Sequence, residues 1–310
     1  MPVEEELARL APETDMLLTI GIFDGVHLGH RKLLSELISR AREQGIQSGV
    51  VTFTEHPEKV FRPEIKLPYL TDIKERTDLL KDAGVDRIIA LPFTRELAEI
   101  RAEHFIRMLI RHLKMCGLVI GADFALGRER EGNASALKRL GEEIGFSVVV
   151  VAPVTINGEV VSSTAIRDAL TQGDMKKVAS LTGRLFTLKK TVRSGAGRGR
   201  TIGFPTANLE IDPGQALPAD GVYATMTEID GASYKSMTYI GERPTFSIGQ
   251  RAVEVYLLDY QGNLYGKELK NSFIERLRHD KKFATPEELK AQIAKDIRQG
   301  KAILNSQGKN

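Results

Sequence analysis

The sequence predicts an α/β domain with a parallel sheet, followed by a small antiparallel barrel or sandwich. Three observations predict this arrangement. The 310 residues are enough for two domains. Continuous apolar segments alternate with helical patterns in the first half, whereas short strand-like segments separated by Gly, Pro, Asp and Asn turns fill the second half. We expect the boundary after Gly183, which gives domains of residues 1–183 and 184–310.

The first half has the pattern of strands buried on both faces, with helices between them. These apolar segments cover residues 17–23, 49–53, 87–91, 118–121 and 147–154. Continuous apolar character, rather than alternation, is typical of a parallel sheet covered on both sides. Residues 30–45 predict the first long helix, because apolar side chains recur there at helical spacing.

The second half predicts an antiparallel domain that ends in one helix. Strand-like segments occupy residues 186–192, 221–228, 236–240 and 251–260. The last helix begins with a capping box, in which Thr285 is the cap, Pro286 suits the first turn and Glu288 reaches back. Its apolar face comprises Leu289, Ile293 and Ile297.

Composition and charge exclude several classes of protein. A net charge of +3 argues against a dedicated nucleic-acid binder, which carries a large basic excess. The longest apolar run, residues 148–154, is far shorter than the roughly 20 residues of a membrane span. The acidic N-terminal segment does not have the pattern of a signal peptide. With Cys116 as its single cysteine, the sequence predicts a cytoplasmic protein without an internal disulfide.

A phosphate site is predicted where the first strand meets the first long helix. Residues 21–30, GIFDGVHLGH, place His27 and His30 three positions apart, on one side of the first helical turn. Ligands of parallel sheets bind beyond the strands' carboxyl ends, and a helix N-terminus offers free N–H groups. Gly29 removes a side chain that would hold a nucleotide away. Two imidazoles suit an α-phosphate that gains charge as pyrophosphate leaves; the alternative is two ordinary surface histidines.

Two later strand ends carry polar groups that fit the same nucleotide. Residues 162–167, SSTAIR, open a helix, and Ser163, Thr164 and Arg167 could hold the β- and γ-phosphates. The alternative for these hydroxyls is helix capping. Asp123 follows another strand and could accept a hydrogen bond from a ribose or an adenine; the alternative is a simple loop.

The second half indicates a kinase without a P-loop. No Walker motif occurs in the sequence, and the glycine-rich residues 195–200 fail as a dinucleotide motif because Arg200 stands in the third glycine's place. Residues 203–208, GFPTAN, place Thr206 and Asn208 at alternate positions of an extended segment. Their side-chain oxygens suit Mg²⁺ bound together with ATP phosphates. The alternative is a proline turn with incidental polar residues.

A carboxylate and a basic cluster complete the candidate groups. Glu254 lies within an apolar strand pattern and is a candidate general base for a substrate hydroxyl; a solvated sheet face is the alternative. Residues 278–283 precede the capped helix and combine basic side chains with Phe283. They suit a phosphorylated ring system, although a solvated turn would have the same pattern.

Together these residues resemble the bacterial bifunctional riboflavin kinase/FAD synthetase family. The resemblance extends from about Leu17 to Ile297. It rests on GIFDGVHLGH (21–30), SSTAIR (162–167), GRTIGFPTAN (199–208), GVYA (221–224), GERPTF (241–246) and EVYLLDYQGNLYGK (254–267). It implies a Rossmann-like α/β nucleotidyltransferase domain with a parallel sheet, then a six-stranded antiparallel β-barrel kinase domain with a C-terminal helix.

The resemblance also implies two activities. The C-terminal domain would phosphorylate riboflavin with ATP and Mg²⁺ to give FMN. The N-terminal domain would transfer AMP from a second ATP to FMN, which gives FAD and pyrophosphate. The expected partners are therefore small molecules, with no nucleic acid and no membrane, and the expected state is a monomer or a weak homo-oligomer.

Site residues are carried over by motif from the family. The adenylyltransferase site would comprise catalytic His27 and His30 with, along the ATP and its phosphates, Gly21, Phe23, Asp24, Gly29, Asp123, Ser163, Thr164 and Arg167. The kinase site would comprise the base Glu254, the Mg²⁺ ligands Thr206 and Asn208, and, along the ATP, Gly195, Arg200, Gly203, Pro205, Thr206 and Tyr265. The flavin side would comprise Arg278, Lys281 and Phe283.

Some residues depart from the usual family pattern. They are Ala125, Leu126, Tyr239 and Tyr256, and they bear on flavin affinity and relative rates rather than on the reaction class. Three alternatives accompany this interpretation: one silent module, a nucleotidyltransferase for another phosphorylated substrate, and a nucleic-acid or regulatory binding protein. The last would use Arg193, Arg198 and Arg200.

Overall fold

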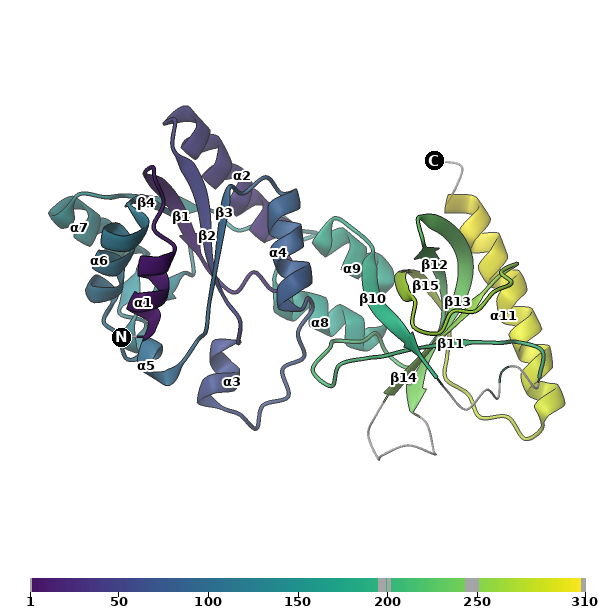
Figure 1. The fold of residues 1–310 in the computed structure, drawn as a ribbon. Coiled ribbons are helices and arrows are strands. Elements are labelled where there is room, and N and C mark those ends of the chain that lie inside the picture. Colours follow the sequence, from purple (N-terminus) through teal and green to yellow (C-terminus); the bar gives the residue numbers. More distant parts are fainter. Residues whose placement is uncertain (1, 195–198, 200–201, 243–250, 308–310) are drawn as a thin grey trace. The chain divides into compact units, whose positions relative to one another are not determined.

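The computed structural model describes residues 2–194, 199, 202–242 and 251–307 (Figure 1). It forms two compact units, Met1–Ser163 and Thr164–Asn310. Each unit has its own sheet system. Within the described residues, no helix combines the length and the apolar character that crossing a bilayer requires.

The first unit is built on a parallel five-stranded sheet, as predicted. Its strands are β1 (Met16–Ile20), β2 (Gln47–Phe53), β3 (Arg87–Leu91), β4 (Met115–Gly121) and β7 (Ser147–Val151). They lie in the order β3-β2-β1-β4-β7. The chain thus proceeds from β1 to one edge and then returns to β4 on the other side of β1. The switch point of the sheet therefore lies between β1 and β4, where doubly wound sheets bind ligands.

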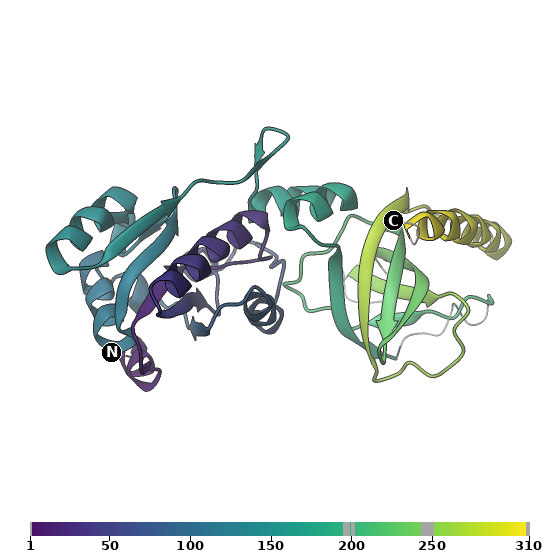
Figure 2. The ribbon, with the colours of Figure 1, turned by 90° about the horizontal axis from the view of Figure 1, so that it is seen from above.

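Helices cover both faces of this sheet (Figures 1 and 2). The helices of this unit are α1 (Pro2–Arg9), α2 (Leu28–Glu43), α3 (Pro57–Phe61), α4 (Ile73–Asp82), α5 (Arg95–Ala98), α6 (Ala102–Leu113) and α7 (Ala134–Ile144). On one face, Leu34 and Leu37 of α2 pack with Leu80 of α4. On the other, Leu7 of α1 and Leu109 of α6 belong to a second apolar core. Burial on both faces explains why the central strands β1, β2 and β4 are apolar without alternation.

Short elements complete the first unit. They are the strand pairs β5 (Ala125–Leu126) with β6 (Gly132–Asn133) and β8 (Thr155–Ile156) with β9 (Glu159–Val160), and a 3-10 turn (Arg128–Arg130). The first predicted strand, 17–23, is too long at its end, because β1 stops at Ile20. Phe23 has a φ of 54°, which does not fit a strand, and α2 correspondingly begins at Leu28 rather than at residue 30.

The second unit is a closed antiparallel barrel, as the resemblance implied. Its strands are β10 (Phe186–Arg193), β11 (Ala207–Leu209), β12 (Gly221–Ile229), β13 (Ala232–Glu242), β14 (Arg251–Leu257) and β15 (Glu268–His279). The order around the barrel is β10-β11-β14-β13-β12-β15. The predicted strand segments include neither β11 nor β15, although β15 pairs with both β10 and β12 and thereby closes the barrel.

The barrel interior mixes apolar and polar side chains. Tyr223 and Phe273 are fully buried there. Next to them is a set of hydroxyls and one amide that are also fully buried, namely Thr225, Thr227, Ser236, Thr238 and Asn271. Their side chains bond one another at 2.7–3.0 Å across β12, β13 and β15. Because these polar groups have partners, their burial is compatible with a stable core.

Helices also belong, largely or wholly, to the part of the second unit that the structure describes. They are α8 (Ser163–Gln172), α9 (Met175–Thr182) and α11 (Pro286–Gln307), of which α8 begins at the last residue of the first unit. α11 packs on the outside of the barrel through Leu304, which contacts a cluster containing Met237 and Ile274 (Figure 2). A largely buried ion pair also joins α11 to the barrel: Arg278 Nε lies 2.9 Å from Asp296 Oδ2, and the Asp296 side chain is 4% exposed.

We expect Asp296→Ala to lower the free energy of unfolding of the second unit by about 3 kcal/mol, because it leaves Arg278 largely buried without its counter-ion. Urea unfolding followed by circular dichroism measures this change. Asp259→Ala is the matched control, since the Asp259–Lys301 pair is exposed and such pairs contribute at most about 1 kcal/mol. Equal losses in the two variants would contradict a buried-pair role for Asp296.

Candidate active sites

The loop between β1 and α2 has an unusual backbone. Phe23 and Val26 have φ values of 54° and 36°, in a region that side chains with a Cβ rarely adopt. Gly25 lies between them at 81°, and a Cβ there would lie 2.8 Å from Leu70 Cδ1. This turn ends at His27 and thus fixes the position of the histidine pair at the switch point of the sheet. Such strain is typical of functional loops that their surroundings hold in place.

The predicted phosphate-site residue Asp24 has a structural role in this loop. Its side chain is buried, and its carboxylate accepts hydrogen bonds at 3.0 Å from the backbone N–H groups of Leu70 and Thr71. The Asp24 carbonyl accepts a bond from Ser163 Oγ at 2.9 Å. Asp24 thus connects the strained loop with two other segments of the first unit. A direct contact between Asp24 and ATP stays a prediction.

His27 and His30 lie together at the start of α2. Their rings stack with centroids 3.6 Å apart and planes 17° apart. His27 Nδ1 accepts the hydrogen bond of the His30 backbone N–H at 3.3 Å, so His27 is the N-cap of α2. In the neutral ring the proton therefore resides on Nε2, which leaves that nitrogen as a donor. This geometry supports the predicted pair of imidazoles on one side of the first turn.

Glycines keep space around this pair. A Cβ on Gly29 would lie 3.1 Å from the His27 ring and 3.3 Å from the Val161 carbonyl. A larger residue at position 29 would therefore displace the ring of the N-cap. A Cβ on Gly21 would lie 3.1 Å from the Phe23 ring. Phe23 is buried, and the centroid of its ring lies 5.0 Å from that of His30, so the two rings pack against each other.

The surroundings of His30 favour its neutral form. Its Nδ1 is buried and has no hydrogen-bond partner among the described residues. Burial, followed by the nearby His27 and Arg76, holds the pKa of His30 well below 6.5. His30 is therefore neutral at physiological pH. A neutral imidazole still carries one N–H, which is enough to donate a hydrogen bond to a phosphate oxygen.

We expect the free energy of unfolding to fall as the pH drops below 6.5, with a share that comes from His30. In that range the unfolded chain binds a proton on His30 that the folded protein rejects, so protonation favours unfolding. Urea titrations at about pH 7.5 and about pH 5.5 measure the loss. His30→Gln, which cannot titrate, should lose less stability between the two pH values than the wild type. Identical pH dependence of both proteins would refute this assignment.

The other predicted adenylyltransferase residues lie on different elements. Asp123 follows β4, on the other side of the switch point, and it is exposed. Ser163, at the start of α8, bonds the Asp24 carbonyl as described above. Thr164 and Arg167 belong to the second unit, so their position relative to the histidine pair stays a prediction.

In the second unit, the predicted kinase residues converge on one part of the barrel wall. Thr206 Oγ1 donates a hydrogen bond to Glu254 Oε2 at 2.9 Å. Asn208, in β11, is the direct cross-strand neighbour of Glu254 in β14. Alternation places Glu254 on the outer face of the barrel, because the flanking Val253 and Val255 are buried inside. A carboxylate and two neutral oxygen-bearing side chains therefore meet at one site.

The residue across from Glu254 on its other side is Tyr239, in β13. Tyr239 departs from the family pattern, and its phenol hydrogen-bonds Asp280. Burial, followed by the Asp280 and Asp220 carboxylates, raises the pKa of Tyr239 to about 12. The phenol therefore stays protonated. Tyr256, the second departure on this face, packs edge-on against Phe204 with centroids 5.7 Å apart.

The remaining kinase residues surround this site or lie outside the described residues. Gly203 has a φ of 88°, which a glycine adopts without strain, and Pro205 lies directly before Thr206. Tyr265 is 51% exposed. Gly195 and Arg200 lie outside the described residues. A residue beside them that only the structure singles out is Gly199, where a Cβ would lie 2.3 Å from the Phe204 carbonyl oxygen.

The flavin-side cluster combines an aromatic ring with two cations. The Arg278 guanidinium and the Lys281 ammonium each lie 5.6 Å from the centroid of the Phe283 ring. Arg278 also pairs with Asp296 of α11, a residue that lies in none of the sequence motifs. In the sequence, Asp296 is marked only by its position four residues after Gln292, which puts both side chains on one side of the helix. In the structure, the Gln292 amide donates a hydrogen bond to Asp296 Oδ1 at 2.7 Å. These contacts fix the cluster on the barrel, whereas contact with flavin stays a prediction.

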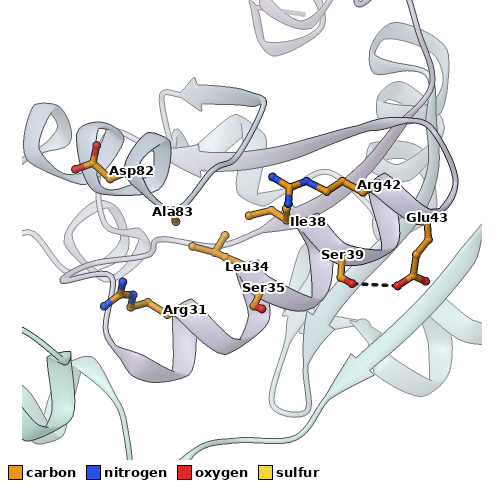
Figure 3. Close-up of a pocket in the computed structure, with 9 residues that line it drawn as sticks. All are labelled: Arg31, Leu34, Ser35, Ile38, Ser39, Arg42, Glu43, Asp82 and Ala83. Carbon is orange, nitrogen blue, oxygen red and sulfur yellow. Dashed lines mark hydrogen bonds between the residues drawn. The ribbon is translucent and has the colours of Figure 1, made fainter.

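Two surface depressions are distinct from the proposed phosphate contacts. One of about 620 Å³ lies between α2 and α4 and contains the Ser39–Glu43 hydrogen bond of 3.0 Å (Figure 3). None of the predicted site residues lines it. The other, of about 640 Å³, lies in the second unit beside Asp280 and Arg276. The described residues contain no cluster of three or more His, Cys, Asp or Glu side chains that could hold a metal ion.

A doubly wound sheet with imidazoles at its switch point, and a barrel with a carboxylate beside two hydroxyl or amide side chains, define a two-domain transferase. The FAD synthetase family model matches residues 10–165, and the riboflavin kinase family model matches residues 182–304. The chain therefore belongs to the bifunctional riboflavin kinase/FMN adenylyltransferase family, with the FAD synthetase domain first. The predicted boundary at 183/184 stays a prediction, because the compact units divide at 163/164.

Relatives of known name match over nearly the whole chain. The bifunctional riboflavin kinase/FMN adenylyltransferase of Escherichia coli K12 is 37% identical, over 92% of each chain. The enzyme of the same name from Pseudomonas fluorescens is 36% identical, over 98% of each chain. A solved structure named as a macrolide-efflux protein from Streptococcus pneumoniae is 30% identical, with a TM-score of 0.86 and coverage of 94% of this chain and 95% of that chain.

Proposed function

We propose that the two activities of this family are divided between the two sites described above. Riboflavin is phosphorylated by ATP at the Thr206–Asn208–Glu254 site, and FMN is adenylylated by a second ATP at the His27–His30 site. The observation that carries this assignment is the 2.9 Å bond from Thr206 to Glu254, which joins the motif expected to bind the nucleotide to the carboxylate expected to act as base. The stacked imidazoles at the switch point support the second assignment.

In the kinase site, Glu254 accepts the proton of the terminal ribityl hydroxyl. The hydroxyl oxygen forms a bond to the γ-phosphorus of ATP, and the bond from that phosphorus to the β–γ bridging oxygen breaks, which releases ADP. Thr206 holds Glu254 Oε2 through its hydroxyl. One carboxylate oxygen is thereby oriented, and the proton acceptor stays close to the nucleotide motif. General-base catalysis of this kind contributes roughly 10²–10⁴-fold.

The donor set beside Glu254 fits Mg²⁺ as a companion of ATP. Thr206 and Asn208 supply neutral oxygens next to a carboxylate, and hard oxygen ligands are those that Mg²⁺ takes. When bound, the ion supplies positive charge that neutralises the phosphates during transfer. Thr206 and Asn208 would hold it, together with phosphate oxygens and water.

In the adenylyltransferase site, the phosphate of FMN is already an anionic nucleophile. Its oxygen forms a bond to the α-phosphorus of ATP, and the bond to the α–β bridging oxygen breaks, which releases pyrophosphate. His27 Nε2–H and the start of α2 donate hydrogen bonds to the charge that develops on the phosphates. Ser163, Thr164 and Arg167 hold the triphosphate end, and Asp123 accepts from the nucleoside.

The proposal also covers the substrates, the compartment and the oligomeric state of the protein. The substrates are riboflavin, FMN and ATP, and the chain works in the cytoplasm as a monomer or a weak homo-oligomer. The single cysteine favours a reducing compartment. The net charge of +3 does not favour a nucleic-acid partner.

One incubation tests the proposed function. The purified chain is mixed with riboflavin, ATP and Mg²⁺, and the flavins are separated by chromatography over time. We expect FMN first and FAD later. FMN without FAD, also when FMN is supplied directly, would mean a silent N-terminal module. No conversion by a folded protein would favour the alternative, a nucleotidyltransferase for a different phosphorylated substrate.

A further inference from the structure

Arg76 is a buried cation in the first unit that none of the sequence motifs includes. It belongs to α4 and is only 5% exposed, whereas arginine is almost never buried without a specific arrangement of partners. Its Nη1 donates to the Phe53 carbonyl at 2.8 Å, and its Nη2 donates to the Thr71 carbonyl at 3.3 Å. Its Nε is buried without a partner among the described residues. Burial on these terms costs stability, so a compensating role is expected.

The Thr71 contact leads directly to the strained loop. The Thr71 backbone N–H donates to Asp24 Oδ1 at 3.0 Å, and the Thr71 hydroxyl accepts from the Gly25 backbone N–H at 2.9 Å. Thr71 is itself 1% exposed. Arg76 therefore bonds the carbonyl of Thr71, and Thr71 in turn bonds both Asp24 and Gly25. These two positions lie in the strained turn that leads to His27, in which Val26 is the last residue with a positive φ.

The Phe53 contact holds the other side of the same loop. Phe53 is the last residue of β2, the strand next to β1. One residue earlier, the Thr52 hydroxyl donates to the Ile22 carbonyl at 3.1 Å, which fixes the chain just before Phe23. The guanidinium thus bridges two supports of the loop, one on each side. A planar group with several donors in fixed directions suits such a bridge better than an ammonium does.

We propose that Arg76 is a positioning residue for adenylyl transfer, which holds the loop before α2 in the conformation that places His27 and His30. This inference rests on the proposed function of the histidine site. The charge of Arg76 faces the carboxylates of Asp24 and Asp72 and the ring of His30. Arg76 is buried and its hydrogen bonds go to the carbonyls of Phe53 and Thr71, so we infer that it acts through the loop rather than on the reacting atoms.

Kinetics of Arg76→Lys and Thr71→Val test the proposal in the full-length protein. Lysine keeps the charge but offers all its donors from one nitrogen, so it cannot reproduce the bridge that Nη1 and Nη2 form between two carbonyls. Valine keeps the shape of Thr71 but removes the acceptor for Gly25 N–H. We expect kcat for FMN adenylylation to fall about tenfold or more in each variant, since a misplacement of about 1 Å can cost up to 10²-fold. The KM for ATP should change less than kcat, and riboflavin phosphorylation should stay at the wild-type rate.

The double variant and a control separate positioning from stability. If Arg76 acts through Thr71, the combined loss in kcat is smaller than the product of the single losses. Lys74→Met on the exposed side of the same helix is the matched control and should leave adenylylation unchanged. Wild-type kcat in folded Arg76→Lys, or multiplicative losses in the double variant, would overturn the inference. A wild-type protein without any adenylylation would instead overturn the proposed function, and the inference with it.

Discussion

Glu254→Gln is expected to lower the rate of riboflavin phosphorylation by roughly 10²–10⁴-fold, the usual contribution of a general base. Glutamine has nearly the same shape and can still accept the hydrogen bond from Thr206, but it cannot take the proton of the ribityl hydroxyl. The adenylylation of FMN that is supplied directly should continue at the wild-type rate. Chromatographic separation of riboflavin, FMN and FAD measures both steps in one sample.

The matched control for this prediction is Glu228→Gln. Glu228 lies on β12 of the same barrel and pairs with Lys270 at the exposed surface, so its substitution should affect neither activity. A loss below about tenfold in Glu254→Gln would mean that another group, or water, takes the proton. Loss of both activities at once would mean that the substitution disturbs more than the kinase site.

His27→Asn is expected to have the opposite pattern, with FAD formation lowered by roughly 10²–10³-fold and riboflavin phosphorylation unchanged. Asparagine is among the preferred N-cap residues, so the start of α2 keeps a side-chain acceptor for the His30 N–H. The variant therefore removes the Nε2–H donor without removing the cap. Steady-state rates with FMN and ATP, with pyrophosphate release as the readout, measure the loss.

His104→Asn provides the control for the loss of an imidazole as such. His104 lies on α6 and is exposed, and we place it in neither site. Wild-type FAD formation in His27→Asn would eliminate the imidazole as a phosphate donor. The His27→Asn and Glu254→Gln variants together decide whether the two sites work independently, because each variant should lower one reaction and leave the other unchanged.

Local patterns in the sequence predicted much of the first unit, since its strands and helices have strong signals. Strands buried on both faces are apolar throughout, and α2 has a clear apolar face, so the element types follow from hydrophobic periodicity alone. The strand end at Ile20 did not follow. The loop that turns away at Phe23 is held by bonds from the Leu70 and Thr71 backbone N–H groups to the neighbouring Asp24 carboxylate, and those residues are distant in sequence.

The second unit shows the limit of such patterns. β15 was missed because its inward positions include Asn271 beside Leu269 and Phe273, which blurs the alternation. The polar residue is acceptable there only because Thr227 and Thr238 bond it inside the barrel. Because β15 is not predicted, local patterns do not distinguish between a barrel and a sandwich. Closure is a property of strand pairing between distant segments, which no local pattern contains.

The sequence by itself determined the element types of the first domain, the motifs and the family that they indicate, because those signals are local and chemically specific. Only the tertiary structure decided that Thr206 bonds Glu254, that His27 caps α2 and stacks on His30, and that Asp296 and Arg76 are buried ions. The physical reason is that burial and hydrogen-bond partners depend on which distant segments pack together. The identity of an arginine or an aspartate does not show whether it lies on the surface or in the core, and its role depends on the residues around it.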